Sequence, residues 1–154
     1  VNVVGVDLSE MMLAEARKKQ VSAEVTFKVT NLENLDFPDN YFDAAASGFT
    51  LCVVADPVRA LQEMLRVTKQ GALIGILDYC LSRDPEVQKW QELISDAASQ
   101  LGFPTDKIKW NALMDYDKLI YHSQLPIDVL ADDRIESPNP FSCGCQLLLR
   151  NMKG

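Results

Sequence analysis

An aspartate directly follows the first apolar segment of this sequence. Residues 1–6, Val-Asn-Val-Val-Gly-Val, are mostly β-branched and apolar, and Asp7 comes next. A short run of this kind is typical of a buried strand in a parallel sheet, and a carboxylate after such a strand can accept hydrogen bonds from both hydroxyls of a ribose. The same side chain could instead cap the helix that follows, so position alone leaves both roles open.

Four cysteines could be considered as metal ligands or as nucleophiles: Cys52, Cys80, Cys143 and Cys145. A tetrahedral site needs about four ligands, and the single histidine, His122, is distant in sequence from the last two cysteines. We therefore expect no metal site, and free thiols as in the reducing cytoplasm. Cys52 is expected to be a small buried apolar residue rather than a nucleophile.

The elements that must position these residues alternate between strands and helices. Strands are predicted over residues 1–6, 25–29, 44–47 and 72–77, and helices over residues 10–19, 57–70, 84–102 and 116–124. Asp56-Pro57 marks one helix start, and Gly71 is expected to end that helix. Residues 127–136 and 144–150 predict a final antiparallel strand pair. This order predicts a single Rossmann-like α/β domain over residues 1–154, with a doubly wound, mostly parallel sheet that binds ligands beyond its carboxyl edge.

The second half of the sequence predicts an amphipathic helix and contains a candidate lid. Apolar residues at helical spacing, Trp90 and Leu93 among them, predict an amphipathic stripe on the helix over residues 84–102. Trp110 and the stretch 103–125 could form a lid over an apolar substrate, or Trp110 could anchor a long connection.

Several short motifs are specific when their order and spacing are taken together. They are Val4-Gly-Val-Asp-Leu-Ser9, Asn40-Tyr-Phe-Asp43, Asp56-Pro57, and Glu63-Met-Leu-Arg66-Val67 with Lys69 and Gly71. Over about residues 3–78 this arrangement closely resembles a class I S-adenosylmethionine-dependent methyltransferase, and most of all the small-molecule enzymes of the ubiquinone/menaquinone methyltransferase type. The resemblance implies S-adenosyl-L-methionine as the cofactor, S-adenosyl-L-homocysteine as the product and a small-molecule acceptor.

Carried over to this chain, the resemblance implies a cofactor site of seven residues: Asp7, Leu8, Met12, Asn31, Leu32, Ser47 and Gly48. Asp7 would hold the ribose hydroxyls. Leu8 and Met12 would pack near the adenine, although Met12 could equally be a core residue. Asn31 stands where the family usually has an aspartate that accepts a hydrogen bond from the adenine amino group. Its amide oxygen can accept that bond without the charge, or Asn31 could simply be a turn residue.

The remaining site residues concern the other parts of the cofactor. The backbone N–H of Leu32 would meet a ring nitrogen of the adenine. Ser47 and Gly48 would approach the methionine part, with Phe49 and Leu51 lining the pocket. The catalytic residues stay unknown, because methyl transfer depends largely on positioning. A general base, where the acceptor needs one, could come from five residues: Asp78, Tyr79, Tyr116, Tyr121 and His122.

The family's first strand and glycine-rich turn have no counterpart in this sequence. No Gly-x-Gly-x-Gly occurs, and in the family that strand lies between those that match residues 1–6 and 44–47 here. We therefore expect either that the chain is an N-terminally incomplete part of a longer protein, or that a partner or a rearranged sheet fills the gap. Unpaired strand edges would otherwise remain and favour self-association into a homo-oligomer.

Charge and composition limit the partners. With 15 basic and 22 acidic residues the net charge is -7, so nucleic acid is not an expected partner. No apolar run approaches the ~20 residues that span a bilayer, so we expect no membrane span. Two further functions stay open. One is a truncated or catalytically silent methyltransferase-like module that acts through self-association or a protein partner. The other is a nicotinamide-dependent oxidoreductase, because Asp7 could equally bind the ribose of a nicotinamide cofactor.

Overall fold

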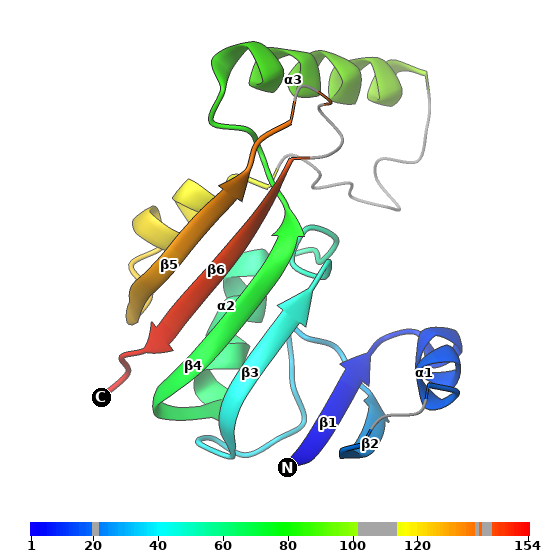
Figure 1. The fold of residues 1–154 in the computed structure, drawn as a ribbon, viewed down its shortest axis with the longest axis vertical. Coiled ribbons are helices and arrows are strands. Elements are labelled where there is room, and N and C mark those ends of the chain that lie inside the picture. Colours follow the sequence, from blue (N-terminus) through cyan, green and yellow to red (C-terminus); the bar gives the residue numbers. More distant parts are fainter. Residues whose placement is uncertain (20–21, 102–113, 138, 140–142) are drawn as a thin grey trace.

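The strands of the computed structural model form two separate sheets (Figure 1), and the structure describes residues 1–19, 22–101, 114–137, 139 and 143–154. β1 (Asn2–Asp7) pairs in parallel with β2 (Glu24–Val29). The second sheet has the order β3-β4-β6-β5, and β3 (Phe42–Gly48) is parallel to β4 (Thr68–Tyr79). β6 (Gly144–Asn151) is antiparallel to β4 and to β5 (Ile127–Ile135), which confirms the predicted final pair.

The helices connect the parallel strands, as a Rossmann-like fold requires. α1 (Glu10–Arg17) joins β1 to β2, and α2 (Pro57–Val67) joins β3 to β4. α3 (Pro85–Gln100) and a π-helical turn, η1 (Lys118–His122), follow β4. The predicted Rossmann-like α/β architecture is confirmed, with helices between strands and antiparallel strands at the end of the chain. The strands are not mostly parallel, because β1-β2 and β3-β4 pair in parallel while β4-β6 and β6-β5 pair antiparallel.

The two helices that connect parallel strands, α1 and α2, begin at the caps that the sequence predicts. Ser9 caps α1, because its hydroxyl accepts the backbone N–H of Met12 at 3.3 Å. Asp56 caps α2, because its carboxylate accepts the N–H of Arg59 at 2.9 Å. Each cap satisfies an N–H group that has no partner within its own helix. The caps also set where the loops after β1 and β3 turn into helix.

The end of α2 differs from the prediction, and Gly71 is not its C-cap. The helix ends at Val67, and the Thr68 hydroxyl donates to the carbonyl oxygen of Met64 at 2.8 Å. Gly71 lies inside β4, near the register shift between Phe42 and Ala44, with a φ of 78°. Such an irregularity needs a left-handed residue, which glycine adopts without a Cβ clash. The glycine therefore marks a bend in a strand rather than the end of a helix.

Asn151 closes α2 from the far end of the chain, and its removal has a predictable cost. Its side chain is fully buried and donates to the carbonyl oxygens of Leu65 at 2.9 Å and Thr68 at 3.1 Å. We expect Asn151→Ala to lower the free energy of unfolding by about 1–2 kcal/mol, because Lys153 still bonds the same carbonyls. Urea unfolding measures this, with the exposed Asn2→Ala as control. Equal effects of the two substitutions would contradict this role.

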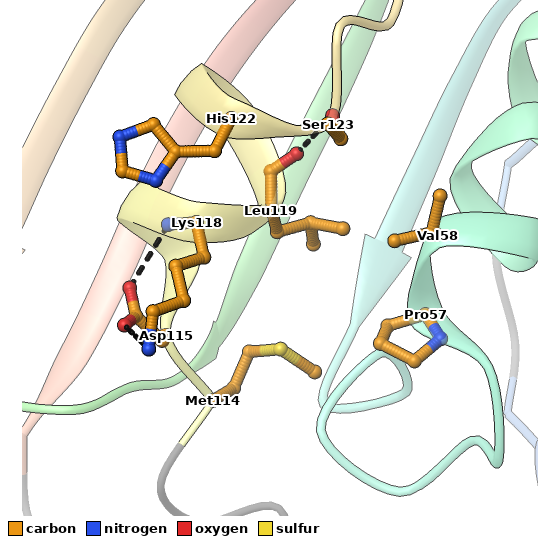
Figure 2. Close-up of a pocket in the computed structure, with 8 residues that line it drawn as sticks. All are labelled: Pro57, Val58, Met114, Asp115, Lys118, Leu119, His122 and Ser123. Carbon is orange, nitrogen blue, oxygen red and sulfur yellow. Dashed lines mark hydrogen bonds and ion pairs between the residues drawn. The ribbon is translucent and has the colours of Figure 1, made fainter.

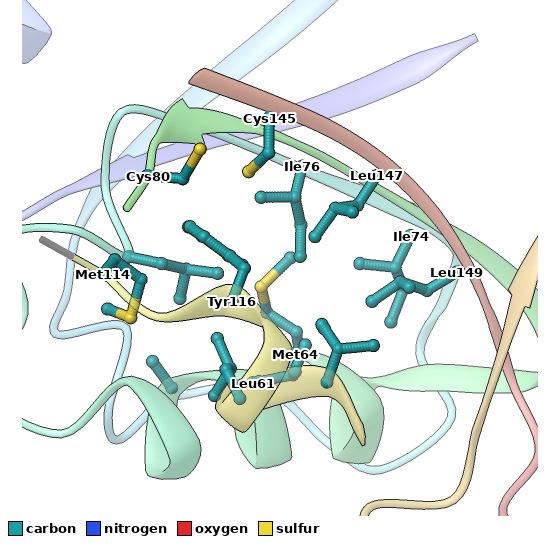
Figure 3. Packing of buried hydrophobic residues seen from close by; sticks show 14 of the residues in the cluster. Leu61, Met64, Ile74, Ile76, Cys80, Met114, Tyr116, Cys145, Leu147 and Leu149 are labelled. Atoms are coloured by element: carbon teal, nitrogen blue, oxygen red, sulfur yellow. The ribbon is translucent and has the colours of Figure 1, made fainter. Parts of the chain in front are cut away.

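The core lies between one face of the four-stranded sheet and the layer formed by α2 and η1 (Figure 3). Along β4 the side chains alternate, so Ile74 and Ile76 are buried while Leu73 and Leu77 are 42% and 39% exposed on the opposite face. The described residues therefore bury one face of this sheet and leave the other largely open.

The prediction that the first strand is buried is wrong. Val3 and Val6 of β1 are 40% and 36% exposed. β1 pairs on one side with β2, and among the described residues no strand pairs with its other edge or joins it to β3. The gap expected between these two strands is therefore present as a break between two sheets, which leaves β1 without the neighbours that would bury it.

The third helix also differs from its predicted packing. The helix itself is confirmed, but Trp90 and Leu93 are 57% and 56% exposed. A polar residue anchors it instead: the buried Gln91 side chain accepts from Ser82 N–H at 2.9 Å and donates to the carbonyl of Cys80 at 3.1 Å. The predicted lid residue Trp110 lies outside the described residues, as does the part of the predicted stretch over residues 103–113.

Candidate cofactor and acceptor site

The carboxyl ends of β1 and β2 bring two of the predicted site residues side by side. Asp7 ends β1 in register with Val29, and its carbonyl oxygen accepts the N–H of Thr30 at 3.2 Å. Asn31 comes immediately after this bond. The parallel pairing, which a buried-strand pattern predicts, therefore places Asp7 at the carboxyl end of β1, the edge at which ligands bind in such folds.

Asp7 also takes part in the turn into α1. Its Oδ1 atom accepts the backbone N–H of Ser9 at 2.8 Å, while Ser9 is the helix cap itself. The residue is exposed, and a carboxylate has lone pairs on both oxygens for further donors. The sequence left open whether Asp7 binds a ribose or caps the helix. Asp7 is not the cap of α1, although it accepts a hydrogen bond from the residue that is. Asp7 braces the turn and still presents its carboxylate at the edge of the sheet.

Asn31 adopts the turn role that the sequence offered as an alternative. Its Oδ1 accepts the N–H of Glu33 at 2.9 Å, and its backbone carbonyl accepts the N–H of Asn34 at 3.0 Å. An amide oxygen has two lone pairs, so it can accept one further hydrogen bond. Leu32, between these residues, is partly buried and packs against the core cluster.

Two apolar side chains stand open to solvent beside Asp7. Leu8 is 68% exposed and Met12 is 56% exposed, whereas Leu13 on the same helix is buried at 3%. The alternative of a core role for Met12 is therefore wrong. Exposed apolar side chains next to a polar anchor offer a surface on which an aromatic base can pack.

Glu33 ties the β2 side of the edge to the start of α2. Its carboxylate accepts the N–H of Asp56 at 2.5 Å, and its carbonyl oxygen accepts from Arg59 Nε at 3.2 Å. The loop after β2 and the loop after β3 therefore meet at one end of the molecule. The sequence predicted no role for Glu33, and its place two residues after Asn31 in the edge loop is the signal that could have indicated one.

β3 ends in two features that the edge of a binding site can use. Of the buried side-chain oxygen and nitrogen atoms that the structure describes, Ser47 Oγ lacks a hydrogen-bond partner. A Cβ added to Gly48 would meet no atom within 4 Å. Phe49 then takes a φ of 53°, which is uncommon for a bulky residue, and its ring lies 5.0 Å from that of Tyr79. Sequence reasoning could not foresee this turn.

The rest of the loop after β3 belongs to the core. Leu51 is fully buried within the core cluster, so its predicted place in the pocket lining is wrong. Cys52 is 5% exposed and is the small buried residue that the sequence predicts. Burial, and then the carboxylate of Asp78, raise the pKa of the Cys52 thiol to about 12, which argues against a nucleophile.

The five candidate bases fall into different surroundings. Asp78 and Tyr116 are almost fully buried, and the tyrosine hydroxyl donates to the Asp78 carboxylate at 2.9 Å. Burial, reinforced by that carboxylate, raises the pKa of Tyr116 far above its ordinary value. The Tyr121 hydroxyl donates to the Asp132 carboxylate of β5 at 3.0 Å. None of these arrangements identifies a base, so the catalytic residues stay unassigned.

His122 and an apolar pocket lie together near the start of α2 (Figure 2). The pocket has a volume of about 380 Å³ and opens between α2 and η1. Its lining is formed by Pro57, Val58, Met114, Asp115, Lys118, Leu119, His122 and Ser123. Because α2 begins directly after the loop that leaves β3, this pocket is at the same end of the sheet as Ser47 and Gly48. An apolar acceptor of modest size fits such a lining.

Metal chemistry and a membrane span find no support in the part of the chain that the structure describes. It contains no group of three or more histidine, cysteine, aspartate or glutamate side chains that could hold a metal ion. No helix within it is long and apolar enough to cross a bilayer. The four cysteines are free, as predicted, and all four are buried.

The residues at the edge fit an adenosyl group better than they fit the methionine end of the cofactor. Asp7, the exposed Leu8 and Met12, and the Asn31 turn offer a carboxylate, an apolar surface and polar backbone for ribose and adenine. The unpartnered Ser47 Oγ and the open space at Gly48 leave room beside β3. The glycine-rich turn that would hold the methionine end is not in the sequence.

A protein-family model and curated relatives match the N-terminal half. The model described as a methyltransferase domain matches residues 1–76. The chain is 38% identical over 95 residues to a 2-phytyl-1,4-naphtoquinone methyltransferase of Nostoc punctiforme, covering 59% of this chain and 41% of the relative. It is 36% identical over 96 residues to a demethylmenaquinone methyltransferase of Paenarthrobacter aurescens, covering 62% of this chain and 36% of the relative. The chain thus spans well under half of either relative.

Solved structures extend the likeness to the whole chain at the level of the fold. A putative methyltransferase from Bacillus halodurans superimposes with a TM-score of 0.73 over 99% of this chain and 84% of its own, at 12% identity. The family match favours a methyltransferase over the nicotinamide-dependent alternative. The motif order, the topology and these matches agree: residues 1–76 of the chain belong to the class I S-adenosylmethionine-dependent methyltransferases, in the ubiquinone/menaquinone methyltransferase-like group.

Proposed function

We propose that this chain takes part in S-adenosylmethionine-dependent methyl transfer to a small lipophilic acceptor, such as a quinol ring. The observation that carries the proposal is the place of Asp7, exposed at the carboxyl end of β1 beside the Asn31 turn. The family of the chain supports the reaction class, and the names of its relatives support a naphthoquinol-like acceptor. The apolar pocket between α2 and η1 supports an acceptor with apolar surface.

In this proposal the residues of the chain bind and orient, and bound S-adenosylmethionine supplies the electrophilic methyl group. Asp7 would accept the ribose hydroxyls, while Leu8 and Met12 would pack on the adenine. Asn31 Oδ1 and the N–H of Leu32 would meet the base edge, and Ser47 and Gly48 would border the methionine part. Orientation of this kind can supply much of the rate of an in-line displacement.

We also propose that this chain holds the adenosyl part of the cofactor by itself, and that a further parallel strand with a glycine-rich turn, lying between β1 and β3, completes the site at the methionine end. The break between the two sheets supports this, because both facing edges lack a paired strand in the described residues. The exposed Val3 and Val6 support it as well.

The proposal is tested by calorimetric titration of the chain with S-adenosylhomocysteine. We expect saturable binding that Asp7→Ala weakens roughly 10- to 100-fold, because a charge-assisted hydrogen bond is worth about 1.5–3 kcal/mol. Asp43→Ala is the matched control, since Asp43 is exposed at the opposite end of β3 and pairs only with Lys69 among the ion pairs found. Equal affinities of the wild type and Asp7→Ala would overturn the ribose assignment.

A second candidate function is a catalytically silent module that acts through self-association or a protein partner. The unpaired edges of β1 and β3 favour it, since such edges pair readily with other chains. In that case the wild type would not bind S-adenosylhomocysteine, and ultracentrifugation would show concentration-dependent assembly. Cofactor binding by a monomer would exclude this candidate.

A further inference from the structure

Asp78 is a buried carboxylate for which the proposed function has no use. It lies one residue before the end of β4 and is 1% exposed. A carboxylate in such a place is costly unless donors satisfy it. Here Oδ1 accepts the N–H of Tyr79 at 2.8 Å, and Oδ2 accepts both the N–H of Cys52 at 3.0 Å and the hydroxyl of Tyr116 at 2.9 Å.

The two donors to Oδ2 come from segments that are 64 residues apart in sequence, and each of them leads to one wall of the apolar pocket. Cys52 is in the loop that leaves β3 after Gly48 and continues into Pro57 and Val58. Tyr116 follows Met114 and leads into η1, which supplies the opposite wall (Figure 2). A single oxygen atom of Asp78 therefore accepts hydrogen bonds from both segments that lead into the pocket walls.

The surroundings explain why a carboxylate, rather than an apolar side chain, suits this position. Cys145 stands opposite Asp78 on β6, and the core cluster encloses Tyr116 (Figure 3). Buried polar contacts in such surroundings have one geometry, because any other arrangement leaves a donor unsatisfied. An apolar residue would fill the space without fixing the loop after β3 relative to Tyr116.

We propose that Asp78 is a positioning residue that fastens the loop after β3 to Tyr116 and thereby sets the acceptor pocket against the edge where the methyl donor binds. This inference rests on the proposed function for its role in methyl transfer. The fastening itself can be tested without any cofactor, which keeps the two separable.

The test of the fastening is site-resolved alkylation of the four cysteines with iodoacetamide, read by mass spectrometry. In the wild type all four thiols are buried. Asp78→Asn keeps the shape, but its single remaining oxygen cannot serve all three donors. We expect Cys52 to react roughly tenfold faster in this variant, while Cys80, Cys143 and Cys145 react at the wild-type rate, because the loop is released and because the carboxylate that adds to burial in raising the pKa of the Cys52 thiol is gone. Tyr116→Phe keeps that carboxylate, so a rise at Cys52 in both variants shows release of the loop. A uniform rise at all four would show global unfolding, and no rise at Cys52 would overturn the proposal.

Tyr116→Phe keeps the carboxylate and removes one of its donors, so it serves if Asp78→Asn does not fold. We expect a smaller rise that is again confined to Cys52. An unchanged rate in this variant would mean that Tyr116 is not fastened through Asp78.

The role in methyl transfer is tested with radiolabelled S-adenosylmethionine and 1,4-naphthoquinol as the probe acceptor. For Asp78→Asn we expect kcat to fall about tenfold while the affinity for S-adenosylhomocysteine changes less than about threefold, since Asp7 and Asn31 are untouched. A parallel loss of cofactor affinity would place Asp78 in the cofactor site instead. A wild type that neither binds nor methylates would refute the proposed function, and the alkylation pattern alone would then decide the fastening.

Discussion

Arg66→Met is expected to lower the free energy of unfolding by about 3 kcal/mol, because it leaves the buried Glu63 carboxylate without its main partner. The Glu63 side chain is 3% exposed, and Arg66 bonds it with Nε and a terminal nitrogen, both at 2.8 Å. The same guanidinium donates to the carbonyl oxygens of Leu35 and Phe37 at 2.8 Å. Arg66 therefore fastens the loop after β2 to α2, and urea unfolding at neutral pH measures its loss.

The control for this variant is a cation whose pair is exposed. Lys69 bonds Asp43 at 2.6 Å, with side chains 53% and 89% exposed. We expect Lys69→Met to cost less than about 1 kcal/mol, because solvent screens the pair. If both variants lost equal stability, burial of Glu63 would not be the cause.

The pH dependence of Arg66→Met gives an independent check on the same pair. In the wild type the bonds from Arg66 hold the pKa of Glu63 below its ordinary value. A carboxyl group whose pKa is lower in the folded state contributes stability that is present above the unfolded pKa of about 4.3 and is lost as the pH falls through the folded pKa. Without Arg66, burial opposes the charged form. The variant should therefore lose less stability than the wild type between about pH 5 and pH 3.

Leu61→Ala is expected to cost about 3 kcal/mol, within the ~2–5 range for buried leucines. Leu61 is fully buried on α2 and belongs to the cluster that fills the space between α2, η1 and the sheet (Figure 3). Truncation leaves a cavity that the surrounding side chains can close only in part. Thermal or urea unfolding measures the change.

Leu73→Ala tests whether the opposite face of the same sheet is open. Leu73 is in β4, next to the fully buried Ile74, but its side chain is 42% exposed on the other face. We expect a cost of about 1 kcal/mol or less, because little of its surface leaves water on folding. A cost equal to that of Leu61→Ala would mean that this face is covered in solution.

Local chemistry explains why much of the fold could be predicted. Ser9 and Asp56 mark helix starts because their side chains accept N–H groups two or three residues ahead, which the sequence alone determines. Strands could be predicted from runs of β-branched residues and from the turn signal over Ser137 to Pro140, because these patterns too depend only on neighbouring residues. Gly71 shows the limit of such signals. A left-handed glycine suits a helix end and a bulged strand equally, and the capping by Asn151, 80 positions away, decides between them.

The candidate site divides in the same way. The place of Asp7 at the end of a strand and the turn at Asn31 followed from their immediate neighbours. The burial of Leu51, the exposure of Met12 and the fastening of Cys52 to Tyr116 by Asp78 did not. Burial depends on which segments meet, and no local pattern carries that information.

The sequence by itself determined the family, the order of strands and helices, and the carboxylate at the edge of the first strand, because these depend on residue types at short spacing. Only the tertiary structure decided that the sheet is divided between β1 and β3, that the stripe of α3 is exposed, and that one carboxylate joins both walls of the apolar pocket. These features arise from contacts between residues distant in sequence, whose energies depend on the packing of the whole chain.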